Sequence, residues 1–263
     1  GMIYMRGQAR DYDQWRQLGN AGWGWDDVLP YFKQTEDHVA GGDAVHGTGG
    51  EWRVEEQRLS WEILDGFRAA AAQTGIPNTN DFNRGNNEGC GYFEVNQKRG
   101  VRWSAADAFL HPVTSRPNLT VLTKALVRQI HFDGKRVSGI ALWHDDEPAR
   151  ATIAGELVLA AGAIGSPQLL QLSGVGPGGL LQDHGVPLVA DIPGVGENLQ
   201  DHLQMRLVFK VKNTKTLNLR ANSLVGRIGM GLEYFLMKRG PMTMAPSQLG
   251  AFAKSDESRE TPN

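Results

Sequence analysis

Three parts of the chain have patterns of polar and apolar residues that predict helices. Residues 1–40 predict helical structure near the N-terminus, since Asp26 and Asp27 suit a helix start before VLPYFKQ. Residues 60–74 predict an amphipathic helix that ends at Gly75, since glycine commonly terminates helices. Residues 222–239 predict a further helix with one apolar stripe, made of Leu224, Val225, Ile228, Leu232, Phe235 and Leu236.

Strand patterns occupy the second half of the chain. Residues 126–132 and 137–143 flank Asp133-Gly134, a dipeptide typical of a tight hairpin turn. Residues 156–161 are nearly all apolar, which predicts a strand buried on both faces of a parallel sheet. Alternation of apolar and polar residues at 205–211 predicts a half-buried antiparallel strand. Two shorter strands complete the set, at 119–123 and 149–153.

Segments rich in glycine, asparagine and aspartate interrupt these patterns. Residues 41–58 are predicted to form a glycine-rich loop with one short strand. Residues 76–100 form an irregular segment that is too long to serve only as a connection between two elements. The pattern changes near residue 203. The sequence therefore predicts two domains, 1–202 with an irregular insert at 41–100, and 203–263, in an α/β fold with mixed α+β character.

Charge and composition narrow the possible functions. The 263 residues include 27 Lys and Arg against 29 Asp and Glu, so the formal net charge is −2. Nucleic acid is excluded as a general partner, because phosphate affinity needs a clustered positive excess. The single cysteine, Cys90, excludes an internal disulfide and indicates a reducing compartment, the cytoplasm. Residues 157–182 carry no charge, but their glycines and prolines predict strand, turn and short helix instead of a membrane span.

Two glycine-containing segments are candidates for nucleotide binding. Gly174, Gly176 and Gly179 match G-x-G-x-x-G, but a helical run precedes them and Pro177 interrupts them, so a plain loop is preferred over a phosphate cradle. Residues 157–166 form a strand that ends in small residues before a turn, at the edge where open α/β sheets bind ligands. Close packing of the strand against the following helix explains this second pattern equally well.

The histidines and the cysteine define no metal or catalytic centre. The seven histidines lack the spacing of a metal site, and no pair of cysteines exists. His202 follows Asp201 and is interpreted as a buried, hydrogen-bonded histidine in preference to a catalytic base. Cys90 has no evident neighbouring base to activate it as a nucleophile. From the residues alone, the chain is a nucleotide-associated α/β protein whose activity stays open.

Three stretches carry a family resemblance. The first is GMIYMRGQARDYDQW with NAGWGWDDVLPYFKQTED. The second begins with KRGVRWSAADAFL and continues to Ile140, within the second strand of the predicted hairpin. The third extends from LVLAAGAIGSPQLLQLSGVGPGGLL to IPGVGENLQDH. Together they resemble the glucose–methanol–choline oxidoreductases, in particular the choline dehydrogenase-like alcohol dehydrogenases. The third stretch is similar to the long second signature of that family, and the resemblance covers nearly the whole chain.

The resemblance implies a fold and a reaction. Residues 1–202 would hold the central part of an FAD-binding domain, with a partial Rossmann-like sheet and a β-meander. Residues 203–263 would begin a substrate-binding domain of antiparallel sheet and helices. Family members oxidise an alcohol by moving hydride from the carbinol carbon to flavin N5, while a histidine takes the hydroxyl proton. The implied cofactor is FAD, the implied substrate is a small alcohol, and the electron acceptor is left open.

The resemblance also implies which residues contact the cofactor. Val127 resembles the family position whose backbone meets adenine. Ala161 and Gly162 resemble the turn that approaches the FAD phosphates and ribose. Gly1 and Met2 resemble the residues next to the flavin ring.

A second set of residues is implied for the substrate pocket, where Met242, Met244 and Gln248 are expected. A choline-type member is expected to carry an acid near Gln248 to meet the substrate ammonium. Because Gln248 is neutral, the resemblance here favours an uncharged alcohol over choline.

Several family features do not appear in this sequence. Members are about twice as long, with a phosphate-binding G-x-G-x-x-G loop expected before Gly1 and the catalytic histidine expected after Asn263. No histidine here matches that position, so no catalytic residue is assigned. The chain is expected to be the central part of such an enzyme, with weak FAD binding alone and self-association through an uncovered sheet edge. The alternatives are a non-catalytic scaffold and a nicotinamide-dependent reductase that uses the loop at 174–179.

Overall fold

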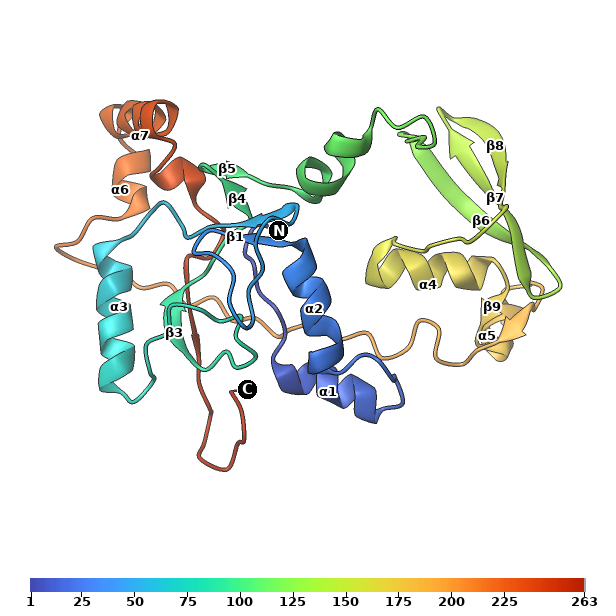
Figure 1. Cartoon of the computed structure of the whole chain (residues 1–263), viewed down its shortest axis with the longest axis horizontal. Helices are drawn as coiled ribbons and strands as arrows, with labels where there is room; N and C mark the ends of the chain where they lie inside the picture. Colours follow the sequence, from blue (N-terminus) through green and yellow to red (C-terminus); the bar gives the residue numbers. More distant parts are fainter. Residues whose placement is uncertain (263) are drawn as a thin grey trace. The chain divides into compact units, whose positions relative to one another are not determined.

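The computed structural model describes residues 1–262, which form two compact units. The first unit combines Gly1–Arg116 with the chain from Phe209 onward, and the second is Pro117–Val208 (Figure 1). Both units mix helices with small sheets, as the predicted α/β class requires. Within residues 1–262, no helix is long and apolar enough to cross a membrane.

The first unit consists of short elements. Its helices are α1 (Ala9–Gln17), α2 (Trp25–Thr35), α3 (Glu62–Gln73), α6 (Leu217–Ala221) and α7 (Leu224–Met237). Its strands are β1 (Glu36–His38), β2 (Trp52–Val54), β3 (Gly89–Tyr92), β4 (Gln97–Lys98), β5 (Val101–Arg102) and β11 (Leu249–Phe252). Single helical turns are η1 (Ala106–Leu110), η2 (His111–Val113) and η3 (Pro241–Thr243). β1 pairs with β2 in parallel, whereas β3–β11 and β4–β5 are antiparallel.

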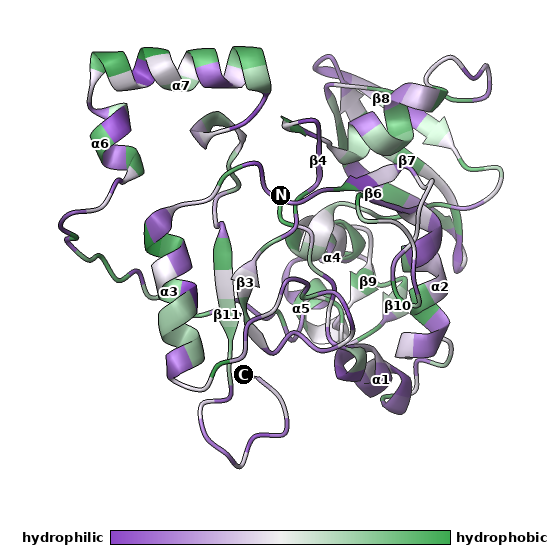
Figure 2. Cartoon of the chain, turned by 60° about the vertical axis from the view of Figure 1, so that its left-hand side comes forward, coloured by the Kyte–Doolittle hydropathy of each residue, from purple (hydrophilic) through white to green (hydrophobic). Residues whose placement is uncertain are grey.

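The helices predicted at 60–74 and 222–239 are confirmed as α3 and α7. Gly75 follows α3 with a φ of +93°, a left-handed conformation that favours glycine and ends the helix. Ser223 caps α7 by accepting a hydrogen bond from the amide of Gly226. All six residues of the predicted apolar stripe on α7 are more than half exposed, and Figure 2 shows the alternating hydrophobic and hydrophilic bands of this helix.

The irregular segment at 76–100 lies at the centre of the first unit. Cys90 and Val95 are completely buried, and the ring of Phe82 lies 5.3 Å from the rings of both Phe93 and Phe252. A segment without regular periodicity therefore supplies much of the core, because its apolar side chains are held by contacts with distant parts of the sequence.

The second unit is built on an antiparallel sheet of three strands. These are β6 (Ala125–Asp133), β7 (Arg136–His144) and β8 (Glu147–Thr152), in the order β6-β7-β8. The hairpin predicted at Asp133-Gly134 is confirmed, and Gly134 has a φ of +59° as such a turn requires. The remaining elements are α4 (Gly162–Leu172), β9 (Val175–Gly176), α5 (Gly178–Asp183) and β10 (Ala190–Asp191), with β9 and β10 parallel.

Three predicted strands are wrong. Residues 119–123, 156–161 and 205–211 form no strand, and the side chain of Val158 is 82% exposed. Apolar runs and alternation indicate which side chains favour burial, but a strand also needs a neighbour for its amides and carbonyls. Within residues 1–262, no other strand pairs with these three segments.

Gly47 allows the loop after α2 to pack against the end of that helix. A Cβ atom at Gly47 would overlap the carbonyl oxygen of Lys33, whereas a Cβ atom at Gly66 in α3 would meet nothing within 4 Å. The substitution Gly47→Ala is therefore expected to destabilise the protein by about 1–3 kcal/mol. Gly66→Ala should be neutral or stabilising by about 0.5–1 kcal/mol, because alanine favours helix. Chemical denaturation of both variants tests this pair, and equal stabilities would contradict it.

Candidate functional site

The first residues of the chain lie beside the segment that follows β3. Ile3 forms an antiparallel bridge with Val95, and the amide of Tyr4 donates to the carbonyl oxygen of Glu94 at 2.9 Å. The amide of Asn96 donates to the carbonyl oxygen of Met2 at 2.7 Å. Met2 is thereby fixed through its backbone, while its neighbour Gly1 is exposed.

The same segment also contacts Gln248, one of the predicted substrate residues. The amide of Phe93 donates to the carbonyl oxygen of Gln248 at 3.0 Å, just before β11 pairs with β3. The side-chain amide of Gln57 donates to the carbonyls of both Phe93 and Gln248. Residues 93–97 therefore contact both Met2 and Gln248, although these two residues are 246 positions apart in the sequence.

The predicted substrate residues differ in exposure. Met242 is 55% exposed, whereas Met244 and Gln248 are half-buried. The side-chain amide of Gln248 donates to the carbonyl oxygen of Ala245 at 3.3 Å. In the described part of the chain, no carboxylate forms a hydrogen bond with Gln248.

The other predicted cofactor residues lie in the second unit. Val127 belongs to β6 and is partly exposed, and the pairing of β6 with β7 shifts register directly after it. Such a bulge leaves backbone groups outside the regular ladder. The end of β6 that begins at Ala125 is exposed over five consecutive residues.

Ala161 and Gly162 form the open start of α4. Gly162 has a φ of +83°, and a Cβ atom there would meet nothing within 4 Å. The amide of Ala161 donates to the hydroxyl of Ser166 at 3.0 Å, and no side chain caps the helix. This turn and residues 199–201 line an open hollow in the second unit. The turn is accessible, with helix amides near it that attract an anion.

The glycine motif at 174–179 has a different arrangement. Val175 and Gly176 form β9, and the amide of Gly178 donates to the carboxylate of Asp191 at 2.8 Å. The carboxylate already satisfies the amide that a phosphate would need, and its charge repels a phosphate. The segment is therefore a short strand followed by the start of α5 instead of the predicted plain loop, and the Asp191 carboxylate argues against a phosphate cradle.

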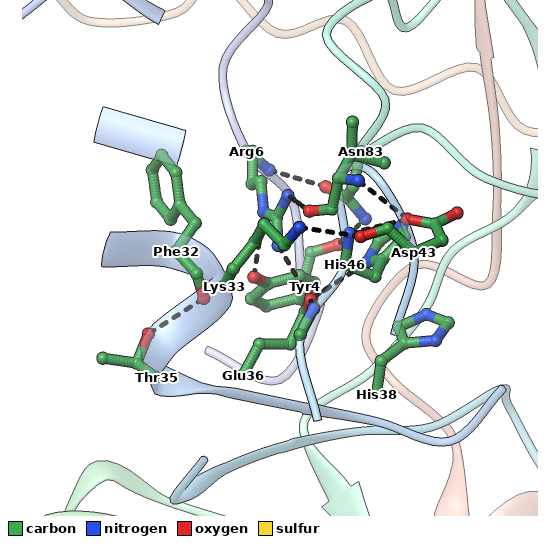
Figure 3. A network of polar contacts seen from close by, with 12 residues as sticks. Tyr4, Arg6, Phe32, Lys33, Thr35, Glu36, His38, Asp43, His46 and Asn83 are labelled. Atoms are coloured by element: carbon green, nitrogen blue, oxygen red, sulfur yellow. Dashed lines mark hydrogen bonds and ion pairs between the residues drawn. The ribbon is translucent and has the colours of Figure 1, made fainter. Parts of the chain in front are cut away.

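The first unit contains a buried cluster of charged residues (Figure 3). Glu36 is completely buried, and its carboxylate accepts hydrogen bonds from His46 Nδ1 at 3.0 Å and from the amide of Gly47 at 2.8 Å. The guanidinium of Arg6 forms an ion pair with the same carboxylate at 2.9 Å. On its other side, His46 Nε2 lies 3.0 Å from the carboxylate of Asp81. Two cations and two anions thus balance one another away from water.

The charges of this cluster shift its pKa values. Burial opposes a charged His46, but hydrogen bonds to Asp81 and Glu36, together with their charges, outweigh burial and raise the pKa of His46 to about 9. Burial favours a neutral Glu36, yet hydrogen bonds from His46 and Gly47 lower its pKa. The pKa of Asp81 is lowered despite burial, mainly by its hydrogen bond from His46. The imidazolium is therefore the stable form of His46 at neutral pH.

A second set of polar contacts connects this cluster to the segment that holds Met2. The amide of Arg6 donates to Asn83 Oδ1 at 2.8 Å, and Asn83 Nδ2 donates to the Glu94 carboxylate at 3.0 Å. The other oxygen of Glu94 lies 2.6 Å from His38 Nε2. No sequence motif indicated these contacts, because the partners are 11 to 77 positions apart and share no spacing rule.

The remaining histidine and cysteine predictions are resolved by burial. His202 is exposed, so its interpretation as a buried histidine is wrong. Cys90 is buried, and burial raises the pKa of its thiol, which disfavours a reactive thiolate. In the part of the chain that the structure describes, no group of three or more His, Cys, Asp or Glu side chains could hold a metal ion.

Comparison with known proteins identifies the family. The GMC oxidoreductase family profile matches residues 1–204, and the chain belongs to this family. The chain is 38% identical over 263 residues to the oxygen-dependent choline dehydrogenase of Brucella ovis, covering all of this chain and 48% of that protein. It is 37% identical over 266 residues to "Alcohol dehydrogenase [acceptor]" of Pseudomonas putida, again covering 48% of the relative. The chain thus spans about half the length of the curated relatives it matches.

Two solved structures have folds similar to that of this chain. An FAD-dependent oxidoreductase from Chaetomium thermophilum aligns with a TM-score of 0.86 at 28% identity, covering 95% of this chain and 46% of that one. Pyridoxine 4-oxidase from Mesorbium loti aligns with a TM-score of 0.69 at 37% identity, covering 73% of this chain and 38% of that one. The neighbours therefore relate this chain to the fold of much longer GMC oxidoreductases.

Three places described above, each taken by itself, suit a part of FAD, the cofactor of this family; two lie in the second unit and one in the first. The open turn at Ala161 and Gly162 has room for a phosphate group and helix amides to attract it. The exposed end of β6 near Val127 offers apolar surface to a planar ring. The backbone of Met2 is held in place while its neighbour Gly1 stays accessible. These five residues carry no charged side chain; the acidic residue that lines the hollow at the start of α4 is Asp201.

The buried cluster predicts how stability depends on pH. His46 has an unfolded pKa of 6.5 and a folded pKa of about 9, so its protonation stabilises the fold fully below pH 6.5. This contribution is expected to fall as pH rises from 6.5 to 9 and to be absent above that. In His46→Gln this loss of stability should disappear, whereas the exposed control His184→Gln should retain it. Urea unfolding at pH 6, 7.5 and 9 measures the free energy of unfolding. The same pH dependence in the unmodified protein and in both variants would refute the prediction.

Proposed function

We propose that the protein to which this chain belongs is an FAD-dependent oxidoreductase that converts an alcohol to an aldehyde. The observation that carries the proposal is the alignment of the entire chain, at 37–38% identity, with a choline dehydrogenase and an alcohol dehydrogenase. The match extends over the whole of this chain and so includes the buried core as well as the accessible turns. It therefore supports a shared reaction more strongly than a single glycine motif does.

The residues of this chain would bind and orient the cofactor. Ala161 and Gly162, at the start of α4, would lie against the phosphates and ribose, and Val127 against adenine. Gly1 and Met2 would lie beside the flavin ring. When bound, FAD supplies the oxidising group that accepts a hydride from the carbinol carbon. The three-stranded sheet of β6, β7 and β8 would be the β-meander of the FAD-binding domain; residues 156–161 form no strand and are not part of this proposal.

The domain limits of 1–202 and 203–263 are retained as part of this proposal. No catalytic residue is assigned to this chain. Among its buried histidines, His46 is committed to Glu36 and Asp81, and His38 is committed to Glu94. A base that takes a hydroxyl proton needs a free lone pair facing the substrate. Both nitrogens of His46 contact carboxylates, and His38 Nδ1 accepts a hydrogen bond from the amide of Ala40 at 3.3 Å, so neither ring has one.

An uncharged alcohol is the proposed substrate class. Met244 and Gln248 would line the pocket, and the side-chain amide of Gln248 carries no charge to pair with an ammonium group. The electron acceptor stays open, since the names of the relatives cite oxygen in one case and an unspecified acceptor in another. We also propose a cytoplasmic location, consistent with the single buried thiol of Cys90. Self-association through exposed apolar residues such as Val158 is part of the same proposal.

A nicotinamide-dependent reductase is disfavoured. That function would need the loop at 174–179 to bind phosphate, and the Asp191 carboxylate occupies the amide of Gly178 instead.

The full-length protein provides the test of the proposed function. We expect it to purify with a flavin absorption spectrum, and anaerobic addition of a primary alcohol should bleach the flavin band. A colourless protein that does not take up FAD on reconstitution would refute the proposal. A flavoprotein that stays oxidised with a panel of primary, secondary and aromatic alcohols would refute the proposed substrate class.

Paired substitutions in the second unit test the proposed phosphate contact. Ala161→Glu places a negative charge at the open start of α4, where it should repel the FAD phosphates and raise the Kd for FAD about tenfold or more. Ala154→Glu adds the same charge at an exposed position in the same unit, away from the turn, and should leave the Kd unchanged. Titration of the apoprotein with FAD, followed by flavin fluorescence, measures both. Equal Kd values for the two variants would remove Ala161 from the FAD site.

A further inference from the structure

Gln97 lies between the two parts of the first unit to which the site is assigned. It belongs to β4 and is only 1% exposed. Its side-chain Nε2 donates to the carbonyl oxygen of Thr243 and also lies 3.3 Å from Sδ of Met2. Thr243 directly precedes Met244. A side-chain amide nitrogen carries two hydrogens, and those of Gln97 connect the proposed flavin side with the proposed substrate side.

The groups on both ends of this connection are themselves fixed. The carbonyl oxygen of Met2 accepts a hydrogen bond from Asn96, the neighbour of Gln97, at 2.7 Å. Thr243 is 3% exposed, and its hydroxyl donates to the carbonyl oxygen of Gly240 at 2.8 Å. The Gln97 amide therefore connects two segments whose backbones are anchored, one through the carbonyl oxygen of Met2 and the other through Thr243.

The oxygen of the Gln97 amide gives a second, independent observation. Oε1 is buried and has no hydrogen-bond partner among residues 1–262. An unpaired buried acceptor lowers stability, and an apolar side chain of the same length would avoid that cost. The amide at this position therefore serves through its two hydrogens, which face Thr243 and Met2, while its oxygen stays unpaired.

We propose that Gln97 is a positioning residue, which holds the segment that begins at Met244 at a fixed distance from Met2. This inference rests on the proposed function, because it takes Met2 as the flavin side and Met244 and Gln248 as the substrate side. Gln97 touches neither cofactor nor substrate and acts through Met2 and Thr243. Small displacements of reacting groups slow a reaction strongly, so loss of the connection lowers the rate more than it lowers stability.

The test uses Gln97→Met in the full-length, FAD-loaded protein. Methionine keeps the length and volume but has no donor for Thr243 and no unpaired acceptor. The matched control is Gln171→Met in the second unit, where Gln171 Nε2 donates to the carbonyl oxygen of Val195 at 2.9 Å. The measurements are kcat, KM, the Kd for FAD, the visible circular dichroism of the bound flavin, and Tm.

In Gln97→Met we expect kcat to fall about tenfold or more, with an altered flavin circular dichroism signal and a Tm close to that of the control. Gln171→Met should keep the kcat and the flavin signal of the unmodified protein. Equal kcat values and equal flavin signals in the two variants would overturn the role of Gln97 while leaving the proposed function intact. If the unmodified protein binds no flavin, the proposed function fails and the role of Gln97 fails with it.

A second variant covers the case in which Gln97→Met does not fold. Gln97→Asn keeps a side-chain amide but is one methylene shorter, so it cannot reach both Thr243 and Met2, and kcat should fall with an altered flavin signal. An unchanged kcat and an unchanged flavin signal in Gln97→Asn would then overturn the proposal.

Discussion

The carboxylate of Glu36 is the constraint on which the first unit depends. It is completely buried, and a buried anion is tolerated only when cations and hydrogen-bond donors replace water. Arg6, His46 and the amide of Gly47 provide this compensation. Removal of one partner from such a cluster typically costs about 3–5 kcal/mol, so three distant segments are held together by one negative charge.

The same constraint extends to the candidate site. Arg6 is tied to the core segment through Asn83 and Glu94, and the chain from Met2 to Tyr4 runs beside that segment. The accessible N-terminal residues are thus supported by a rigid, charge-balanced group of buried side chains. The segment before β11 contacts the same core segment. A site assembled from distant segments gains precision from such support, because binding groups need a fixed geometry.

Local interactions explain which predictions succeed. The hairpin at Asp133-Gly134, the helix at 224–237 and the helix end at Gly75 depend on residues within a few positions of one another. The strand predicted at 156–161 depends on a neighbour elsewhere in the sequence, and within residues 1–262 it has none. Likewise, the candidate residues Val127, Ala161 and Gly162 came from a family resemblance, since no spacing rule in the sequence distinguishes an accessible turn from a packed one.

The sequence by itself determined the family, the helices at 60–74 and 222–239, the hairpin and the mixed α/β class, because these follow from motifs and from interactions between near neighbours. Only the tertiary structure decided that His46 is held as an imidazolium, that His202 is exposed, and that Gln97 lies buried between Met2 and Thr243. The physical reason is that burial and charge compensation depend on partners 10 to 146 positions away. Those partners come together only when the chain has folded.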